Sequence, residues 1–287
     1  MLTTIWSGLT VGALYILVGL TYNITFAATG IFNFAQSQIV MASAFAVYVA
    51  TGEHNWPTLV TLVVCAAIGA AIGLIEELVA IRPLNDSRGL GYLVTTVGAA
   101  VVIQGFAYAF FGPNAFNVGF FAGNQPLTVA GGQTTPVSIA IVILAVAGTI
   151  ALWLVSVRTR WGLASRGVTM DQQLAAIRGI NVRRVVLFAF VIAGLLGGVI
   201  GLFVAPYVGV SYDLGNNLVI FAFLVMAVGG FGSYWGVLIA GFPVGVLQAE
   251  CERWLPAGAS TIVLFFALLG VLMVRPMGLL GRGMRSV

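Results

Sequence analysis

Charged residues are the scarcest component of this sequence. Its 287 residues include twelve basic and eight acidic side chains, while 60% of the residues are hydrophobic. Soluble domains carry about 25% charged residues, against 7% in this chain. So few ionisable groups cannot cover the core of a 30.0 kDa globule, and the mean hydropathy is +1.08. The composition excludes a soluble domain, offers no basis for a nucleic-acid partner, and predicts a polytopic protein in a lipid bilayer.

Three residue types needed for common catalytic sites are missing or rare. The sequence has no lysine, one histidine (His54) and two cysteines (Cys65 and Cys251). A Walker A phosphate loop needs its lysine, so the chain cannot be a P-loop ATPase. The cysteines lack metal-ligand spacing, and a single histidine makes metal or nucleophile chemistry improbable. We therefore expect no catalytic residue, no metal and no cofactor on this chain, and no enzymatic activity of its own.

Apolar runs long enough to form membrane helices fill most of the chain. Crossing a hydrocarbon core of about 30 Å takes about 20 apolar residues in a helix. The runs lie at about 4–25, 34–50, 57–80, 91–111, 136–157, 185–205, 217–229, 234–250 and 259–274. They predict one all-α transmembrane helical bundle over residues 1–287, with about eight to nine membrane passes. Because only GGFGS separates 217–229 from 234–250, these two are either full spans or halves of a broken, re-entrant helix.

The distribution of arginine predicts the orientation. Eleven of the twelve arginines fall at Arg82 and Arg88, within residues 158–184, and after residue 274. Even numbers of predicted passes separate these three segments, and basic loops stay in the cytoplasm. Only Arg253 lies in a loop that this rule places outside. With nine passes, the N-terminus is expected outside and the C-terminus in the cytoplasm, in a bacterial inner membrane.

Pairs of glycines four residues apart recur along the predicted helices. Such pairs let helices approach closely in lipid, so packing is their expected role. The pairs are Gly8/Gly12, Gly69/Gly73, Gly194/Gly198, Gly197/Gly201 and Gly241/Gly245.

Residues 158–184 hold seven of the twenty charged side chains and form the largest predicted cytoplasmic loop. Within it, Thr169 and Gln172 match a capping box, which predicts a helix start at Thr169. A short helix would run to about Arg178, with Gly179 in the C′ position. This helix either docks in a groove of a partner or is an ordinary surface helix whose arginines only set the topology.

Five collinear stretches resemble one family of membrane proteins, the LivH-type permeases of branched-chain amino-acid ABC importers. The segment GIFNFAQSQIVMASAFAVY is similar to that family's NFAHG…GAY segment, and QLAAIRGINVRRV is similar to its cytoplasmic loop. The other three are RPLNDSRGLGYLVTTVGAAVVIQ, AVGGFGSYWGVLIAGFPVGVLQAE and the terminal VRPMGLLG. Together they extend from about residue 23 to 281, nearly the whole chain.

The resemblance implies that the loop 158–184 carries a coupling helix that seats in a cleft of a cytoplasmic ATPase. It also implies the partners: two ABC ATPase subunits that bind ATP and Mg, a second homologous permease or another copy of this chain, and an external solute-binding protein. In the family's E-A-A-x-x-x-G pattern, only Ala175 and Gly179 of this chain agree. The implied coupling residues are Thr169, Asp171, Gln172, Gln173, Leu174, Ala175, Ala176 and Gly179.

The best candidate for a substrate pathway is the polar stretch NFAQSQ. Asn33 with Gln36 three residues later indicates a capped helix start after a break at Gly30, and helix N-termini stabilise carboxylates. A second break at Gly229–Gly232, with Ser233 as N-cap, is its expected counterpart. Either break can equally be a tight turn between spans. The full set of pathway candidates is Asn33, Gln36, Ser37, Gln38, Thr95, Thr96 and Gln104, of which the last three can instead be interhelical contacts.

No ionisable residue lies in the middle of a predicted span, which disfavours a proton-coupled transporter. Glu76 and Glu77 sit at a helix end beside Arg82. An external ATP-driven motor therefore fits best, with branched-chain amino acids as the leading substrate and urea, short amides or aromatic acids as alternatives. A non-ABC channel or a secondary transporter is the competing class.

Overall fold

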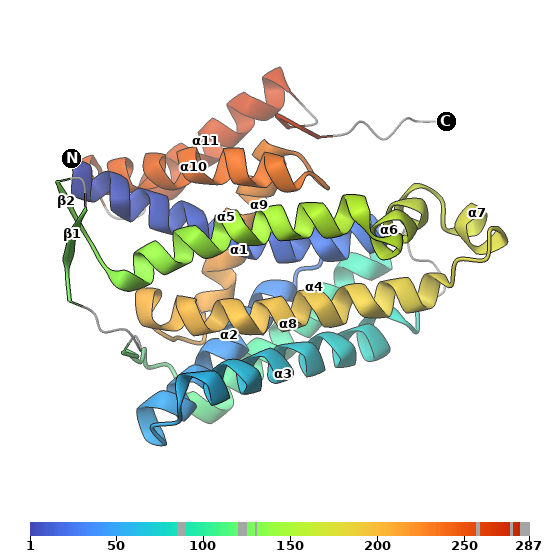
Figure 1. Ribbon diagram of the computed structural model, residues 1–287, viewed down its shortest axis with the longest axis horizontal. Coiled ribbons are helices and arrows are strands. Elements are labelled where there is room, and N and C mark those ends of the chain that lie inside the picture. The colour runs from blue at the N-terminus through green and yellow to red at the C-terminus, as the bar shows by residue number, and fades with distance from the viewer. Residues whose placement is uncertain (85–89, 120–124, 130, 257–258, 276–277, 282–287) are drawn as a thin grey trace. The chain divides into compact units, whose positions relative to one another are not determined.

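The computed structural model describes residues 1–84, 90–119, 125–129, 131–256, 259–275 and 278–281 (Figure 1). The helices are α1 (Leu2–Thr29), α2 (Gln36–Val47), α3 (Thr58–Glu76), α4 (Leu90–Phe111), α5 (Pro136–Arg158), α6 (Arg160–Met170), α7 (Gln172–Ile177), α8 (Val182–Val208), α9 (Leu214–Gly229), α10 (Tyr234–Trp254) and α11 (Ala259–Val274). Two π-helical turns, η1 (Tyr48–Glu53) and η2 (Glu77–Ile81), extend α2 and α3, and the strands β1 (Leu127–Val129) and β2 (Gly132–Thr134) form an antiparallel hairpin.

The predicted all-α transmembrane bundle is confirmed, since a helix lies at each of the nine apolar runs. Among the described residues, six helices are long and apolar enough to cross a membrane. They lie at Leu2–Thr29, Thr58–Ile81, Gly91–Phe111, Pro136–Arg158, Val182–Val208 and Tyr234–Trp254. The apolar helices α9 and α11 are shorter, and α2 has only twelve residues. Shortened helices next to full spans match the expectation of broken or re-entrant segments.

The described chain divides into two compact units. The first comprises Met1–Asn23, Ala122–Trp153 and Ile220–Val287, and the second comprises Ile24–Phe121 and Leu154–Val219. Each unit combines segments that are distant in the sequence. Three predicted topology markers, Arg88, Arg282 and Arg285, lie outside the described residues.

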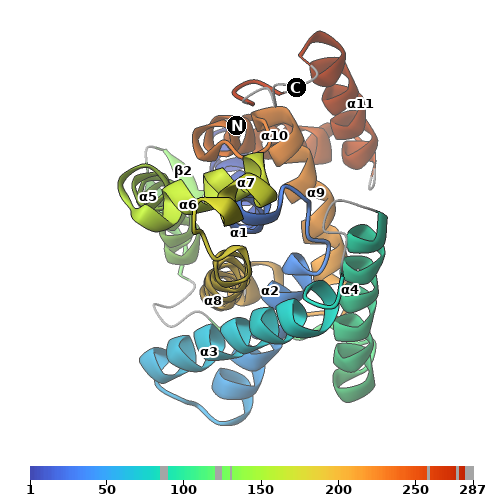
Figure 2. The ribbon, with the colours of Figure 1, turned by 90° about the vertical axis from the view of Figure 1, so that its right-hand side faces the viewer.

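In the second unit, α8 lies alongside α3 and α2 (Figures 1 and 2). Glycines make this approach possible, as the sequence predicted. A Cβ atom at Gly194 would collide with the backbone of Gly69, and one at Gly198 with the backbone of Cys65. A Cβ at Gly201 would lie 2.7 Å from the Cβ of Ser43 on α2. The backbones therefore touch, and dispersion between them replaces the side-chain packing of a soluble core.

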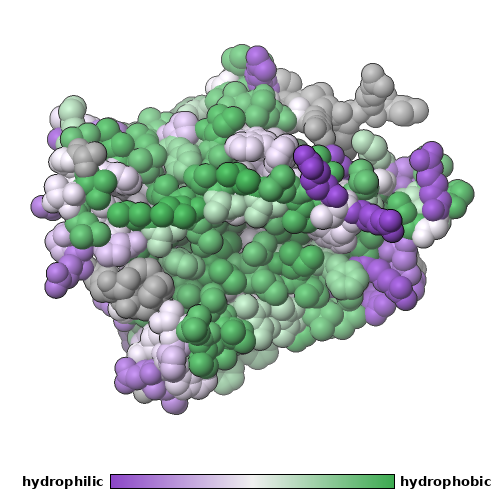
Figure 3. Space-filling view, viewed as in Figure 1, coloured by the Kyte–Doolittle hydropathy of each residue, from purple (hydrophilic) through white to green (hydrophobic). Residues whose placement is uncertain are grey.

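Burial separates the interior helix from the outer ones in this unit. Ten of the twelve residues of α2 are buried, and α2 contacts α8, α3 and α4 (Figure 2). By contrast, α3 exposes Leu59 and Val63, and α4 exposes Val101 and Phe110. Apolar side chains also cover the visible flank of α8, and hydrophilic ones gather toward α6 and α7 (Figure 3). Exposed apolar flanks are what a lipid environment requires.

The first unit uses the same packing device. Gly8 and Gly12 on α1 meet Gly245 and Gly241 on α10: an added Cβ at Gly8, Gly12 or Gly245 would overlap the facing backbone, and one at Gly241 would overlap the Ile16 side chain. The β1–β2 hairpin is tied to the start of α1, because the Trp6 indole donates to the Val129 carbonyl at 3.1 Å.

A valine in place of Gly198 should destabilise the protein, because its side chain has no space against the Cys65 backbone. Overpacking of this kind costs about 1–3 kcal/mol or more. We expect Gly198→Val to lower the melting temperature of the purified protein by several degrees, measured by differential scanning fluorimetry in detergent. Gly105→Val is the matched control, since no atom lies within 4 Å of a Cβ there. Equal melting temperatures for the two variants would contradict close packing at Gly198.

Candidate translocation site and docking helix

The chain reverses between α1 and α2 at Gly30. This residue has φ +75°, a conformation that only glycine adopts without strain. Thr29 secures the turn: its hydroxyl donates to the Thr25 carbonyl at 2.9 Å and accepts from the Ile31 amide at 3.2 Å. The end of α1 is therefore capped by its own residues, and the break predicted at Gly30 is confirmed.

Asn33 is placed differently from the sequence prediction. It does not cap α2, which begins at Gln36 with Ala35 as N-cap and no side-chain cap. The Asn33 side-chain oxygen instead accepts from the Ala35 amide at 3.0 Å, closing an Asx turn inside the break. The prediction of an Asn33 cap is thus wrong, because the intervening turn adds two residues before the helix. The side-chain nitrogen of Asn33 is left facing the interior.

The other polar residues of the stretch hold α2 in place. Gln36 donates from Nε2 to the Ala193 carbonyl of α8 at 3.0 Å, and Gln38 donates to the Asn216 side chain at the start of α9 at 2.8 Å. Gly215 allows this second contact, because a Cβ there would overlap the Gln38 amide. Ser37 is fully buried between them. Both glutamines are interhelical links in this structure.

The three candidates on α4 are less closely grouped. Thr95 and Thr96 donate to the carbonyls of Tyr92 and Leu93, one turn back in their own helix. Thr96 is buried, whereas Thr95 and Gln104 are half-buried. The residue of α4 that the structure adds to the site is Tyr92, whose side chain is 2% exposed and lies beside Thr29.

Glu76 and Glu77 are buried, which the sequence did not indicate. Their side chains are 4% and 2% exposed. Glu77 is faced by Arg82 and Arg183, while Glu76 lies beside Asn33 and Tyr92. The spacing of small residues along α3 could have predicted this burial. The buried residues of the helix are Thr61, Cys65, Gly69, Gly73 and Glu76. That spacing places Glu76 on the glycine face of the helix, so the packing face itself points to it.

The second break, at Gly229–Gly232, is closed by several contacts. Ser233 caps α10 as predicted, accepting from the Gly236 amide at 3.0 Å. Asn23 of α1, which sequence reasoning missed, accepts from the Gly232 amide at 3.0 Å and donates to the Ser233 carbonyl at 3.4 Å. The amides of Leu279 and Leu280 donate to the Val228 and Gly229 carbonyls at the end of α9. These contacts give the VRPMGLLG segment a structural role.

The loop 158–184 contains two helices rather than one. Thr159 caps α6, and Asp171 separates α6 from α7. The predicted capping box is wrong: Thr169 lies inside α6, and Asp171 is the N-cap of α7, accepting from the amides of Gln173 at 2.8 Å and Leu174 at 3.0 Å. Aspartate is a stronger N-cap residue than threonine, so the N-cap of α7 is Asp171, two residues after the predicted Thr169.

The predicted end of α7 is confirmed. Gly179 follows the C-cap residue Arg178 with φ +84°. The amide of Gly179 donates to Ala176, and that of Ile180 to Ala175, which is the Schellman pattern.

The apolar side chains of this loop face outward. Met170 is 84% exposed, Leu174 57% and Ile177 81%. Ala175, by contrast, is buried within the chain. Gln172 and Gln173 start the helix, and Ala176 is exposed beside Ile177. Thr169 points the other way and donates from its hydroxyl to the Ala27 carbonyl near the end of α1.

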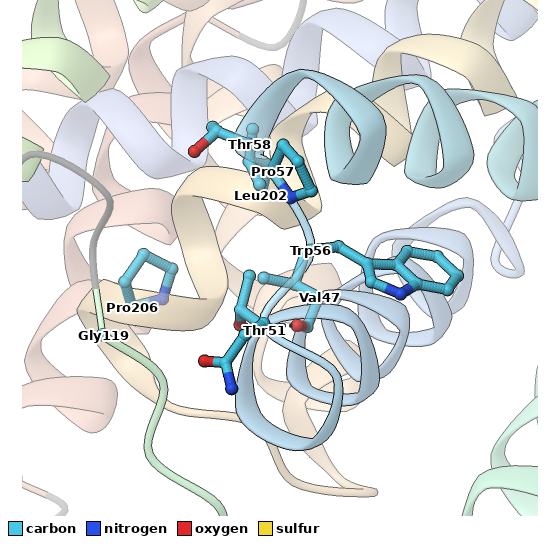
Figure 4. A pocket seen from close by; sticks show the side chains of 9 residues that line it. Val47, Thr51, Trp56, Pro57, Thr58, Gly119, Leu202 and Pro206 are labelled. Atoms are coloured by element: carbon cyan, nitrogen blue, oxygen red, sulfur yellow. Dashed lines mark hydrogen bonds between the residues drawn. The ribbon is translucent and has the colours of Figure 1, made fainter.

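A separate pocket of about 280 Å³ lies where α2 passes through η1 toward α3 (Figure 4). Thr51 and Pro206 lie on opposite sides of it, and the Trp56 ring points away. The lining residues are Val47, Thr51, Asn55, Trp56, Pro57, Thr58, Gly119, Leu202 and Pro206. The sequence did not predict this pocket, and its mixed lining shows no charged group.

Comparison with known proteins decides the family. A family model described as the permease component of a branched-chain amino acid transport system matches residues 4–274. The chain belongs to this permease family. No solved structure matches the chain.

Curated relatives of the permease match it over most of its length. LivH of Salmonella typhimurium, a high-affinity branched-chain amino acid transport permease, is 29% identical over 98% of this chain and 96% of its own. BraD of Pseudomonas aeruginosa, described in the same terms, is 27% identical over 96% and 94%. FruF of Bifidobacterium longum, a fructose import permease, is 24% identical over 89% and 72%. The resemblance stated from the sequence is thus confirmed: the chain is a multi-pass ABC permease.

We expect Asn23→Leu to destabilise the permease, because it removes the two hydrogen bonds by which the buried Asn23 side chain holds the Gly232 amide and the Ser233 carbonyl. The net contribution of one such hydrogen bond is about 0.5–1.5 kcal/mol. Thermal unfolding in detergent should show a melting temperature several degrees lower. Thr21→Val is the control, since the Thr21 hydroxyl donates only to the Val18 carbonyl of its own helix. If both variants melt together, Asn23 does not secure the second break.

Proposed function

We propose that this permease moves branched-chain amino acids through the membrane as part of an ABC importer. An external solute-binding protein would deliver the solute, two cytoplasmic ATPase subunits with ATP and Mg would drive the cycle, and a second homologous permease or a second copy of this chain would complete the pathway. The relatives LivH and BraD, both high-affinity branched-chain amino acid transport permeases, support this substrate. Because the relative FruF is a fructose import permease, a sugar is the alternative substrate that the experiment has to exclude.

The observation that carries the ATPase partnership is the exposed face of α7. Leu174 and Ile177 on α7, with Met170 at the end of α6, are large exposed apolar side chains in the arginine-rich loop 158–184. Arg158, Arg160, Arg166, Arg178, Arg183 and Arg184 surround them along the chain. Water leaves such a face uncovered, and a groove of the ATPase that the family resemblance implies would bury it. Capping at both ends keeps the six-residue helix folded for docking.

The family pattern needs one adjustment in this chain. Ala175 occupies a position of the E-A-A-x-x-x-G pattern but is buried against its own loop. We infer that the ATPase contacts the exposed side chains of Leu174 and Ile177, while the buried Ala175 and the terminating Gly179 stabilise the helix.

Orientation completes the proposal. The loop 158–184 and the C-terminus would face the cytoplasm, and the N-terminus would lie outside, in keeping with the arginine distribution.

Transport itself is tested with the purified importer in proteoliposomes. We expect uptake of radiolabelled leucine that requires both enclosed ATP and a cognate solute-binding protein. Leucine uptake without ATP would exclude the importer, and ATP-dependent uptake of fructose alone would exclude the amino-acid substrate.

Ile177→Asp should uncouple the ATPase. A buried isoleucine contributes about 1.5–3 kcal/mol, and a factor of ten corresponds to about 1.4 kcal/mol. We expect stimulation of ATP hydrolysis by the binding protein to fall at least tenfold. The control Ile177→Met keeps an apolar side chain of similar size and should retain stimulation within twofold. If Ile177→Asp also stays within twofold, α7 is not the docking helix.

Labelling tests the orientation directly. An Ile177→Cys variant should react with a membrane-impermeant maleimide in inside-out vesicles and not in intact spheroplasts. The parent permease provides the control, because Cys65 is buried and Cys251 is half-buried. Reaction of Ile177→Cys in intact spheroplasts would place the loop outside and overturn the ATPase partnership.

A further inference from the structure

Three polar side chains from different segments meet inside the second unit. Asn33 comes from the break, Glu76 from the end of α3 and Tyr92 from the first turn of α4. They are 1%, 4% and 2% exposed, and Glu76 lies beside both of the others. Within the described part of the chain, no partner meets hydrogen-bond distance and angle at the Asn33 Nδ2 atom, either Glu76 carboxyl oxygen or the Tyr92 hydroxyl. The Asn33 side chain does lie close enough to Glu76, and Thr29 close enough to Tyr92, for a weak polar contact.

Such an arrangement is costly for folding alone. Buried polar groups in proteins are nearly always bonded, and the cost of leaving one without a partner is greatest for an ionisable group such as a carboxyl. Glu77, the next residue, shows the ordinary solution, since Arg82 and Arg183 face it. Glu76 has no such cation among the residues that interact with it. A buried Glu76 carboxyl group without a partner points to a ligand that would supply the missing hydrogen bonds.

The chemistry of the unpaired atoms defines that ligand. The two carboxyl oxygens accept hydrogen bonds and, when ionised, favour a positively charged donor, and the adjacent Asn33 amide can donate to an acceptor. An α-amino acid supplies both from one carbon atom: its ammonium has three donors, and its carboxylate accepts from an N–H group. A neutral sugar would leave the Glu76 carboxylate without a counter-charge, and a simple anion would be repelled by it.

The surroundings suit an aliphatic side chain. Tyr92 belongs to a buried apolar cluster with Ile81, Val186 and Phe190. Ile31, Ala80, Leu84 and Val182 pack against this cluster. Ile31 lies two residues before Asn33, so the apolar wall and the polar groups are adjacent along the break.

We propose that Asn33 and Glu76 form a transient binding site for the amino-acid backbone of the solute, with Glu76 holding the ammonium group and Asn33 the carboxylate. Tyr92 bounds the site between these groups and the apolar cluster. This inference rests on the proposed function. The site is enclosed in this structure, so it fills in a conformation of the cycle in which the break at Gly30 opens.

Uptake by the complete importer tests the role of Glu76. In proteoliposomes with ATP and the binding protein, Glu76→Gln should lower leucine uptake at least tenfold, while stimulation of ATP hydrolysis by the binding protein stays within twofold of the parent. Glu77→Gln is the matched control: it makes the same change one residue away, beside two arginines, and should keep at least half of the uptake.

Three results would overturn the proposal. These are Glu76→Gln uptake within twofold of the parent, an equal loss in Glu77→Gln, and parallel loss of uptake and ATPase stimulation in Glu76→Gln. Failure of the parent importer to take up leucine with ATP would instead remove the proposed function. Normal parent uptake with normal Glu76→Gln uptake removes only the binding site.

A ligand series on the unaltered importer covers the case in which Glu76→Gln fails to assemble. Without the binding protein, leucine at high millimolar concentration should raise the melting temperature of the complex, because a ligand that binds the folded state stabilises it. Isoamylamine, which lacks the carboxylate, and 4-methylpentanoate, which lacks the amine, should produce less than half of that shift. A shift from 4-methylpentanoate equal to that from leucine would show that Glu76 does not hold an ammonium group.

Discussion

Every interruption of a membrane helix has to bond its own backbone groups, because hydrocarbon offers none. The two breaks of this permease satisfy that constraint in different ways. At the first, Thr29 and Asn33 bond neighbouring amides within a few residues. At the second, the partners come from far along the chain: Asn23 of α1 and the amides of Leu279 and Leu280. The first break is therefore closed locally, whereas the second depends on distant segments.

Glycine packing and polar contacts depend on each other around α2. A Cβ at Gly197 would lie 3.3 Å from Gln36 Nε2, so the small residue leaves room for the amide that bonds to Ala193. Similarly, Gly215 lets the start of α9 approach Gln38. In a lipid-exposed unit, where apolar burial gives little preference between helices, such specific contacts determine which helix lies inside. This explains how a twelve-residue helix can be the interior element.

The sequence predicted what depends on composition and short-range pattern. The nine helical runs, the close approach at Gly69/Gly73 and Gly194/Gly198, and the Gly179 terminus all follow from local chemistry. The start of α7 did not, because Thr169 and Asp171 both fit a cap and only the fold of α6 decides between them. Asn23 was missed since one polar residue in an apolar run has no periodicity. The burial of Glu76 was missed because a charge near a helix end ordinarily lies at the membrane surface.

Only a few residues connect the exposed helix α7 with the buried polar groups around Asn33. Asp171 ends α6 and caps α7, so one residue joins the two helices. At the end of α6, the Thr169 hydroxyl bonds to the Ala27 carbonyl and also to that of Ser165 at 2.9 Å. A Cβ at Gly30 would lie only 3.7 Å from the Thr169 methyl group. The end of α6, one residue away from α7, therefore lies against the end of α1 where the chain turns toward Asn33. Two capped helices that share one residue leave little room for local rotation between them, so this contact is where a movement of the proposed docking helix would reach the break.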